Sequence, residues 1–90
     1  MSIKYGTTTV ATTATALGLD ESATSNARHG ITVKNNTGVT VYIGDSQVTS
    51  SNGFPVAAGE TFSGDLDRTD RLYAAVASGT QNVPWIQVSA

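Results

Sequence analysis

The side chains that could support catalysis or bind a metal are few and scattered along the chain. His29 is the single histidine among 90 residues, and neither a His-x-His nor a His-Glu-x-x-His spacing occurs. A metal site built on imidazole ligands therefore lacks its usual pattern. A nucleophilic triad would need His29 beside a positioned serine, yet the chain has no Gly-x-Ser-x-Gly motif. We interpret His29 as a surface or capping residue at the entrance to a strand.

Acidic residues gather in one place, where Asp65, Asp67 and Asp70 lie within a six-residue stretch. Such a cluster raises the question of Ca²⁺, but an EF-hand loop needs oxygen ligands at alternate positions, a central Gly and a terminal Glu. Arg68 and Arg71 interleave with these acids and compete for them. We therefore expect a solvated, salt-bridged turn in which each exposed ion pair contributes little stability.

Glu60 and Asp65 would be the remaining carboxylate pair for glycoside hydrolysis. Their odd spacing places them on opposite faces of a regular strand, which separates the two carboxylates. The chain also has no Cys, so a thiolate nucleophile, a thiolate metal site and a disulfide are all absent. We expect a protein that is not an enzyme, with no cofactor, no metal and no small-molecule substrate.

Composition excludes two further classes of partner. Five Lys and Arg residues in a chain of formal net charge -2 form no basic patch for nucleic acid. The N-terminal stretch has no apolar signal-peptide region, and no run approaches the ~18 apolar residues of a membrane span. Ninety residues accommodate one core, so we expect a single β domain over residues 1–90. It would comprise a Thr-rich part (1–27) and a main sandwich (28–90).

Short segments with alternating apolar and polar residues predict β-strands. They cover residues 31–34, 39–43, 60–66, 71–77 and 83–88, and two Thr-rich candidates cover 3–10 and 12–17. The alternation places Ala75 outside, and it places these residues on the face that we expect to form the core: Ile31, Val33, Val39, Val41, Ile43, Phe62 and Leu66. About seven to eight short antiparallel strands separated by turns are typical of an all-β fold, either a β-sandwich or a jelly roll.

The segments between the strands carry their own signals. Asn and Gly at residues 35–38 predict a turn that joins 31–34 and 39–43 into a hairpin. Pro84 should restrict the start of the last strand to a sheet edge or a bulge, since proline cannot donate to a ladder. Residues 19–27 would form either a short helix capped by Asp20 or a polar loop.

Four aromatic residues are the candidates for an interface: Tyr42, Phe54, Tyr73 and Trp85. Tyr42, Tyr73 and Trp85 fall on the phase of their strands that we expect to face outward, and aromatic side chains concentrate in protein interfaces. Phe54 lies in a long connection, residues 48–59, and we expect its ring to hold that connection in place. Two alternatives stay open: the aromatics are packing residues under a covering loop, or they form a platform for carbohydrate.

A run of turn and core motifs follows Arg28. The motifs are an apolar strand that ends in Asn (residues 31–35), Val-Tyr-Ile-Gly (41–44), Val-Thr (48–49) and Gly-Phe-Pro-x-x-Ala-Gly-Glu (53–60). Residues 70–74 and 77–80 continue the pattern. In these motifs the chain resembles a group of small virion proteins of tailed bacteriophages. The Thr-rich N-terminal part resembles that group only in its general character and not in a specific motif.

The resemblance implies a β-sandwich or jelly roll carried on a phage particle. It points first to a capsid cement, or decoration, protein on the capsid exterior, which binds the major capsid protein and stabilises its assembled lattice. Such a protein would be a homotrimer, made in the host cytoplasm. The alternative is a module associated with a head or tail fibre, which binds a host-surface glycan or another virion protein.

Overall fold

The computed structural model describes residues 2–18, 29–66 and 70–89, and all the regular structure within them is β. Residues 19–27, for which we expected a helix or a loop, lie outside the described residues. The strands are β1 (Ser2–Val10), β2 (Thr15–Ala16), β3 (His29–Lys34), β4 (Val41–Gly44), β5 (Phe54–Val56), β6 (Thr61–Leu66), β7 (Tyr73–Ala75) and β8 (Gln81–Ser89). The strand expected over residues 12–17 is therefore confined to Thr15 and Ala16.

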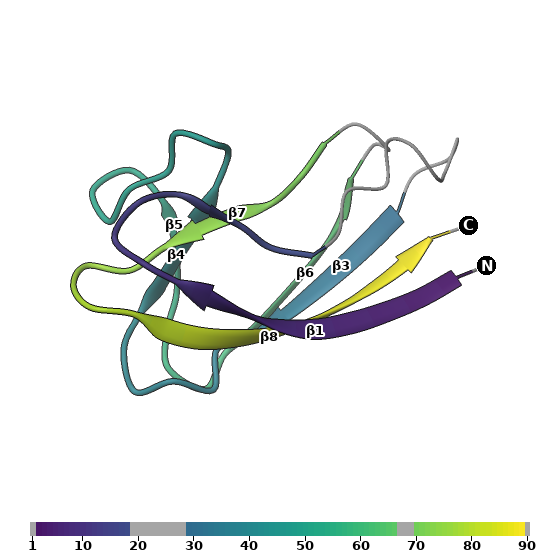
Figure 1. Cartoon of the computed structure of the whole chain (residues 1–90), viewed down its shortest axis with the longest axis horizontal. Helices are drawn as coiled ribbons and strands as arrows, with labels where there is room; N and C mark the ends of the chain where they lie inside the picture. The colour runs from purple at the N-terminus through teal and green to yellow at the C-terminus, as the bar shows by residue number, and fades with distance from the viewer. Residues whose placement is uncertain (1, 19–28, 67–69, 90) are drawn as a thin grey trace.

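These strands form two antiparallel four-stranded sheets, in the orders β1-β8-β3-β6 and β2-β7-β4-β5 (Figure 1). The chain changes sheet at each connection except the one between β4 and β5. This order, in which the first and last strands are neighbours, is that of a jelly roll. The expected β-sandwich is thus confirmed, and the strand order identifies it as a jelly roll.

The hairpin predicted from residues 31–34 and 39–43 is wrong. β3 pairs with β6 and β8, whereas β4 pairs with β5 and β7 in the other sheet. Val39, which we expected on the core face of a strand, precedes β4 and is 43% exposed. A turn signal shows where the chain bends, but the partner of each strand depends on contacts far away in the sequence.

A buried asparagine explains the crossing. The Asn35 side chain is fully buried, and its Nδ2 donates to the carbonyl oxygens of Val39 at 2.8 Å and Val56 at 2.7 Å. Its Oδ1 accepts from the backbone N–H and the hydroxyl of Thr37. The Asn35 backbone also donates to the carbonyl of Glu60 at 2.9 Å. One residue therefore joins the ends of strands in both sheets.

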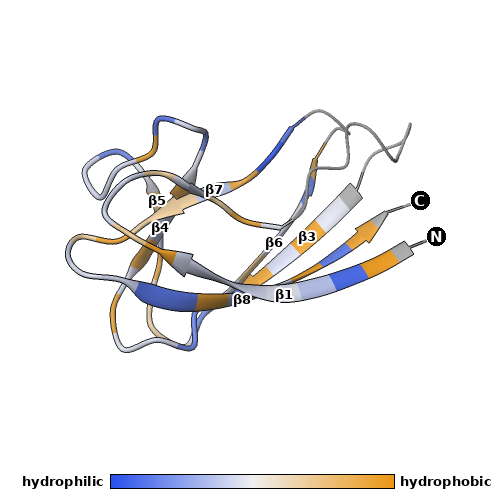
Figure 2. Cartoon of the chain, in the orientation of Figure 1, coloured by the Kyte–Doolittle hydropathy of each residue, from blue (hydrophilic) through white to orange (hydrophobic). Residues whose placement is uncertain are grey.

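The core between the sheets contains most of the residues that the alternation placed there. Ile31 and Val33 of β3 are buried, as are Val41 and Ile43 of β4, and the bands along β3 in Figure 2 show the alternation. Phe62 and Leu66 of β6 pack against this cluster from the edge, also as expected. The remaining members of the core cluster are Val10, Leu17, Val56, Leu72, Ala74, Val76, Val83 and Trp85. Ala75 lies opposite Tyr42 and so has the outward phase expected of it, but it is buried on that face.

β8 lies inside its sheet, although Pro84 led us to expect an edge or a bulge at its start. The ladder between β8 and β3 ends at the pair of Trp85 and Val33, next to Pro84. The first residues of β8 therefore pair with β1 alone. The missing N–H of Pro84 falls where one side of the strand has no partner, which is how an interior strand accommodates a proline.

Trp85 faces the core, and the prediction that it faces outward is wrong. Its side chain is only 8% exposed, and its indole N–H donates to Thr8 Oγ1 at 3.0 Å. The ring lies over Gly6, where a Cβ would approach an indole carbon to 3.1 Å. Both phases of β8 are partly apolar, with Val83 and Trp85 on one and Ile86 and Val88 on the other. Alternation alone therefore does not choose between them.

Replacing Asn35 by Ala should lower the free energy of unfolding by about 3 kcal/mol, because the carbonyls of Val39 and Val56 lose their donor. Urea denaturation followed by tryptophan fluorescence measures the change. Asn36→Ala, at the exposed neighbouring position, is the matched control and should change stability by less than about 0.5 kcal/mol. Equal stabilities for the two variants would contradict the structural role of Asn35.

Trp85→Ala should cost about 3 to 5 kcal/mol, the usual range for removing a large buried aromatic side chain. Phe54→Ala, at a position that is 62% exposed, should cost less than about 1.5 kcal/mol. Thermal unfolding monitored by circular dichroism compares the two variants. A Trp85→Ala protein as stable as the wild type would mean that the indole lies outside the core.

Candidate functional site

Phe54 is exposed at the edge of its sheet and is not the residue that holds the long connection. Val56, two residues later, is the buried side chain of β5. The Phe54 ring instead meets Phe62 of β6, with 6.3 Å between ring centroids and a tilt of 58°. Together with Pro55 and Glu60, these rings line a shallow hollow between the edge strands of the two sheets.

Tyr42 and Tyr73 lie on the outer face of the sheet β2-β7-β4-β5, and both are half-buried. Their phase is as predicted, but a loop covers part of this face. Val48 in that loop is buried, and a Cβ on Gly53 would come within 2.6 Å of Tyr42 Cβ. The alternative in which Tyr42 is a packing residue under a loop therefore fits the structure.

The residues considered for chemistry do not assemble into a site. His29 begins β3, opposite Leu66 and Ser89. Asp65 lies in β6 and Asp70 is exposed, whereas residues 67–69 of the predicted salt-bridged turn lie outside the described residues. In the part of the chain that the structure describes, no three His, Asp or Glu side chains come close enough to hold a metal ion. No helix there is long and apolar enough to cross a membrane.

The opposite face of the molecule carries an apolar patch that the sequence reasoning missed. On the outer face of the sheet β1-β8-β3-β6, Ile3 lies opposite Val88 and Tyr5 opposite Ile86. The exposed fractions are 61% for Ile3, 37% for Val88, 81% for Tyr5 and 41% for Ile86. We call these four residues the outer-face patch. Contiguous exposed apolar groups of this kind often mark an interaction surface.

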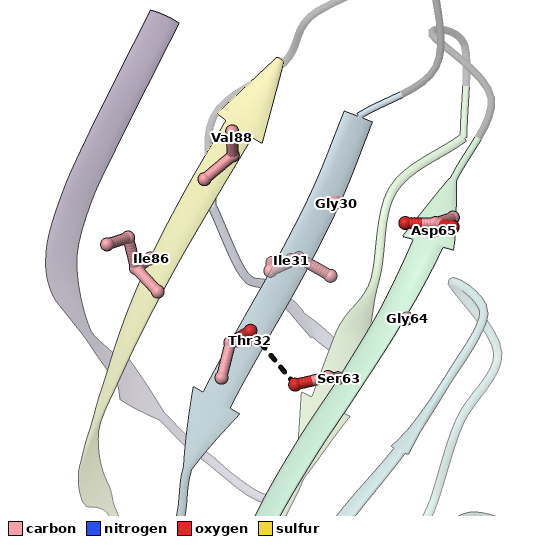
Figure 3. Close-up of a pocket in the computed structure, with 8 residues that line it drawn as sticks. All are labelled: Gly30, Ile31, Thr32, Ser63, Gly64, Asp65, Ile86 and Val88. Atoms are coloured by element: carbon pink, nitrogen blue, oxygen red, sulfur yellow. Dashed lines mark hydrogen bonds between the residues drawn. The ribbon is translucent and has the colours of Figure 1, made fainter. Parts of the chain in front are cut away.

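A hollow lies beside the outer-face patch, over Gly30 of β3 (Figure 3). In the sheet, Gly30 sits between Val88 of β8 and Asp65 of β6, and it has no side chain to fill the gap. Ile86 and Val88 form an apolar wall. The opposite wall is polar, with Asp65 and a hydrogen bond of 2.9 Å between the hydroxyls of Thr32 and Ser63.

This face carries little charge. By strand phase, the charged side chains on its four strands are Lys34 and Asp65, and the Lys34 ammonium donates to the carbonyl of Gly59 at 3.1 Å. Hydroxyl side chains occupy five of the other outward positions: Thr7, Thr9, Thr32, Thr61 and Ser63. A nearly neutral surface that combines an apolar patch with many hydroxyl groups resembles a protein interface in composition.

Comparison with known proteins shows the fold. No protein-family model matches the chain, and no curated protein does. A solved structure, described as "Bacillus endospore appendages form a novel family of disulfide-linked pili", has a TM-score of 0.59. The similarity covers 98% of this chain and 85% of that chain at 21% sequence identity. Because these 90 residues contain no Cys, the disulfide linkage of that pilus family has no counterpart within them.

Proposed function

We propose that this protein is a structural protein that acts by binding an assembled protein lattice and has no catalytic activity. The observation that carries the proposal is the outer-face patch, which exposes Ile3, Tyr5, Ile86 and Val88 at adjacent positions of two strands. A small domain gains nothing in stability from such exposed apolar groups. Burying them against a partner would be favourable.

The specific assembly that we propose is a phage capsid, on whose exterior the protein would act as a cement for the major capsid protein. The motifs behind this resemblance are structural: Val-Tyr-Ile-Gly forms β4, and Gly53 fits closely against Tyr42 and Val48. They support the type of module, and the patch supplies a contact surface. A protein that binds only the assembled lattice stabilises it by mass action at every site it occupies.

The second candidate is a module of a fibre or appendage that contacts a glycan or another structural protein. The structural similarity to a pilus protein favours a fibrous assembly. A glycan platform built on Trp85 is incompatible with the burial of its indole. Tyr5 and Phe54 are the exposed aromatic residues that remain for such a ligand.

Particles purified from cells that express the gene test the cement function. We expect the protein in many copies spread over the shell, measured by quantitative mass spectrometry and cryo-electron microscopy of the particles. Ile86→Asp should abolish incorporation, because it places a charge at the centre of a buried contact. Val39→Asp is the matched control, since Val39 is equally exposed, at 43% against 41%, but lies outside the patch.

The cement function would be wrong if the protein were absent from particles or present in a few copies at one vertex. The few-copy result would instead favour the fibre module. Incorporation of Ile86→Asp at the level of Val39→Asp would show that the outer-face patch is not the contact surface.

A further inference from the structure

The edges of the two sheets differ in how well they resist pairing with another strand. β2 has two residues and β5 has three, including Pro55. β6 is longer but contains Gly64 and the charged Asp65. Shortness, proline and charge are the usual protections of an edge strand. β1 contains Lys4 and Gly6 but no proline, and its nine residues pair with β8 in unbroken register, so among the described strands it is the longest free edge.

Hydrogen bonds define which residues of β1 face this free edge. Asn35, just after β3, donates its N–H to the carbonyl of Glu60, just before β6. The odd-numbered residues of β3 therefore direct their backbone N–H and C=O groups toward β6, and the even-numbered residues direct theirs toward β8. Because Thr32 lies opposite Ile86, the even-numbered residues of β8 bond to β3. The backbone N–H and C=O groups of its odd-numbered residues, including Trp85, are therefore directed toward β1. On β1, the even-numbered residues bond to β8. The odd-numbered residues direct their N–H and C=O groups to the free edge.

We propose that two copies of this protein pair through their β1 edges, antiparallel and centred on Tyr5. In this register Tyr5 lies opposite Tyr5 of the second copy, and Ile3 lies opposite Thr7. Odd-numbered residues of one copy then lie opposite odd-numbered residues of the other. The free-edge hydrogen bonds require this pairing, and it keeps the outer faces of the two sheets on the same side. β1 is the outermost strand of its sheet in Figure 1, and the half that begins at the N-terminus extends away from the chain's turn into β2.

Two neighbouring registers are less favourable. Centring the pair on Lys4 would place two ammonium groups directly opposite each other, which destabilises a sheet. Centring it on Gly6 would place two glycines, which have no side chains to pack across the strands, at the middle of the ladder. The Tyr5 register avoids both, because Lys4 faces Gly6, and it forms an aromatic cross-strand pair.

Pairing in this register would merge the two outer-face patches. Each patch exposes on the order of 400 Å², by the exposed fractions of its four residues. A specific interface buries about 800 Å² on each partner, so one patch is too small and two adjoining patches reach that size. The twofold pair would therefore present a continuous apolar strip, from Ile86 of one copy across both Tyr5 rings to Ile86 of the other.

Single cysteines test the register directly, because the chain has no native Cys. A hydrogen-bonded antiparallel pair has Cα atoms about 5.5 Å apart, within the range that a disulfide spans. We expect Tyr5→Cys to form a disulfide-linked dimer under mild oxidation, seen on non-reducing gels and over a range of dilutions. Thr9→Cys, on the same strand and face but beyond the paired residues, should form no disulfide-linked dimer, because the two cysteines would lie far apart in this register. Equal cross-linking of the two variants, or none of Tyr5→Cys, would overturn the register.

Sedimentation velocity tests the pairing without added cysteines. The wild type should sediment as a dimer, and Thr7→Pro as a monomer, because the proline removes an N–H that faces the free edge and not the β8 ladder. Thr9→Pro carries the same change beyond the paired residues and should stay dimeric. Circular dichroism checks that each variant is folded. A wild type that is monomeric, or trimeric as the phage resemblance implies, would overturn the twofold pairing.

The β1 pairing and the proposed lattice binding can be tested independently of each other. Ile86 lies on β8, away from the free edge, so Ile86→Asp should keep the dimer and lose incorporation into particles. A dimeric Ile86→Asp protein that still enters particles would contradict the lattice contact alone. A wild type that enters particles as a monomer would contradict the pairing alone.

Discussion

The hydrogen bonds of the buried Asn35 amide are the constraint on which the jelly roll depends. They connect the end of β3 to the start of β4 through Val39 and to the end of β5 through Val56. A buried amide that lost these partners would be costly, because no water replaces them. The bend after β3 therefore has one well-satisfied geometry, and that geometry sends the chain into the opposite sheet. The positions of β4, β5 and β6 follow from it.

The second organising contact is the packing of Trp85 over Gly6, completed by the hydrogen bond from the indole to Thr8. It places β1 and β8 in register along the inner face of their sheet. Because side chains alternate along a strand, an inward Trp85 requires that Ile86 and Val88 face outward. The outer-face patch is thus a consequence of the core, because the same strand contributes the largest core side chain and two of the four patch residues.

The fold and the patch bear on function in different ways. A jelly roll serves many unrelated proteins, so the similarity to a pilus protein identifies an architecture and not an activity. The function we propose depends instead on the nearly neutral face around Tyr5 and on the phage-like motifs. Most of those motifs occupy β4, β5 and the loop between them in the other sheet, whereas residues 31–35 belong to β3 of the sheet that carries the patch.

The amino-acid sequence by itself determined the fold class, the approximate strands and most of the core, because alternation and turn residues are local signals. It placed Ile31, Val33, Val41 and Ile43 correctly. Only the tertiary structure decided which strands pair, since the crossing at Asn35 depends on partners up to 25 residues away, at Glu60. It also decided the phase of β8, because both faces of that strand are partly apolar. The candidate site depends on this phase. Trp85, which we had predicted to face outward, lies in the core, and the exposed apolar surface is formed around Tyr5 and Ile86 instead.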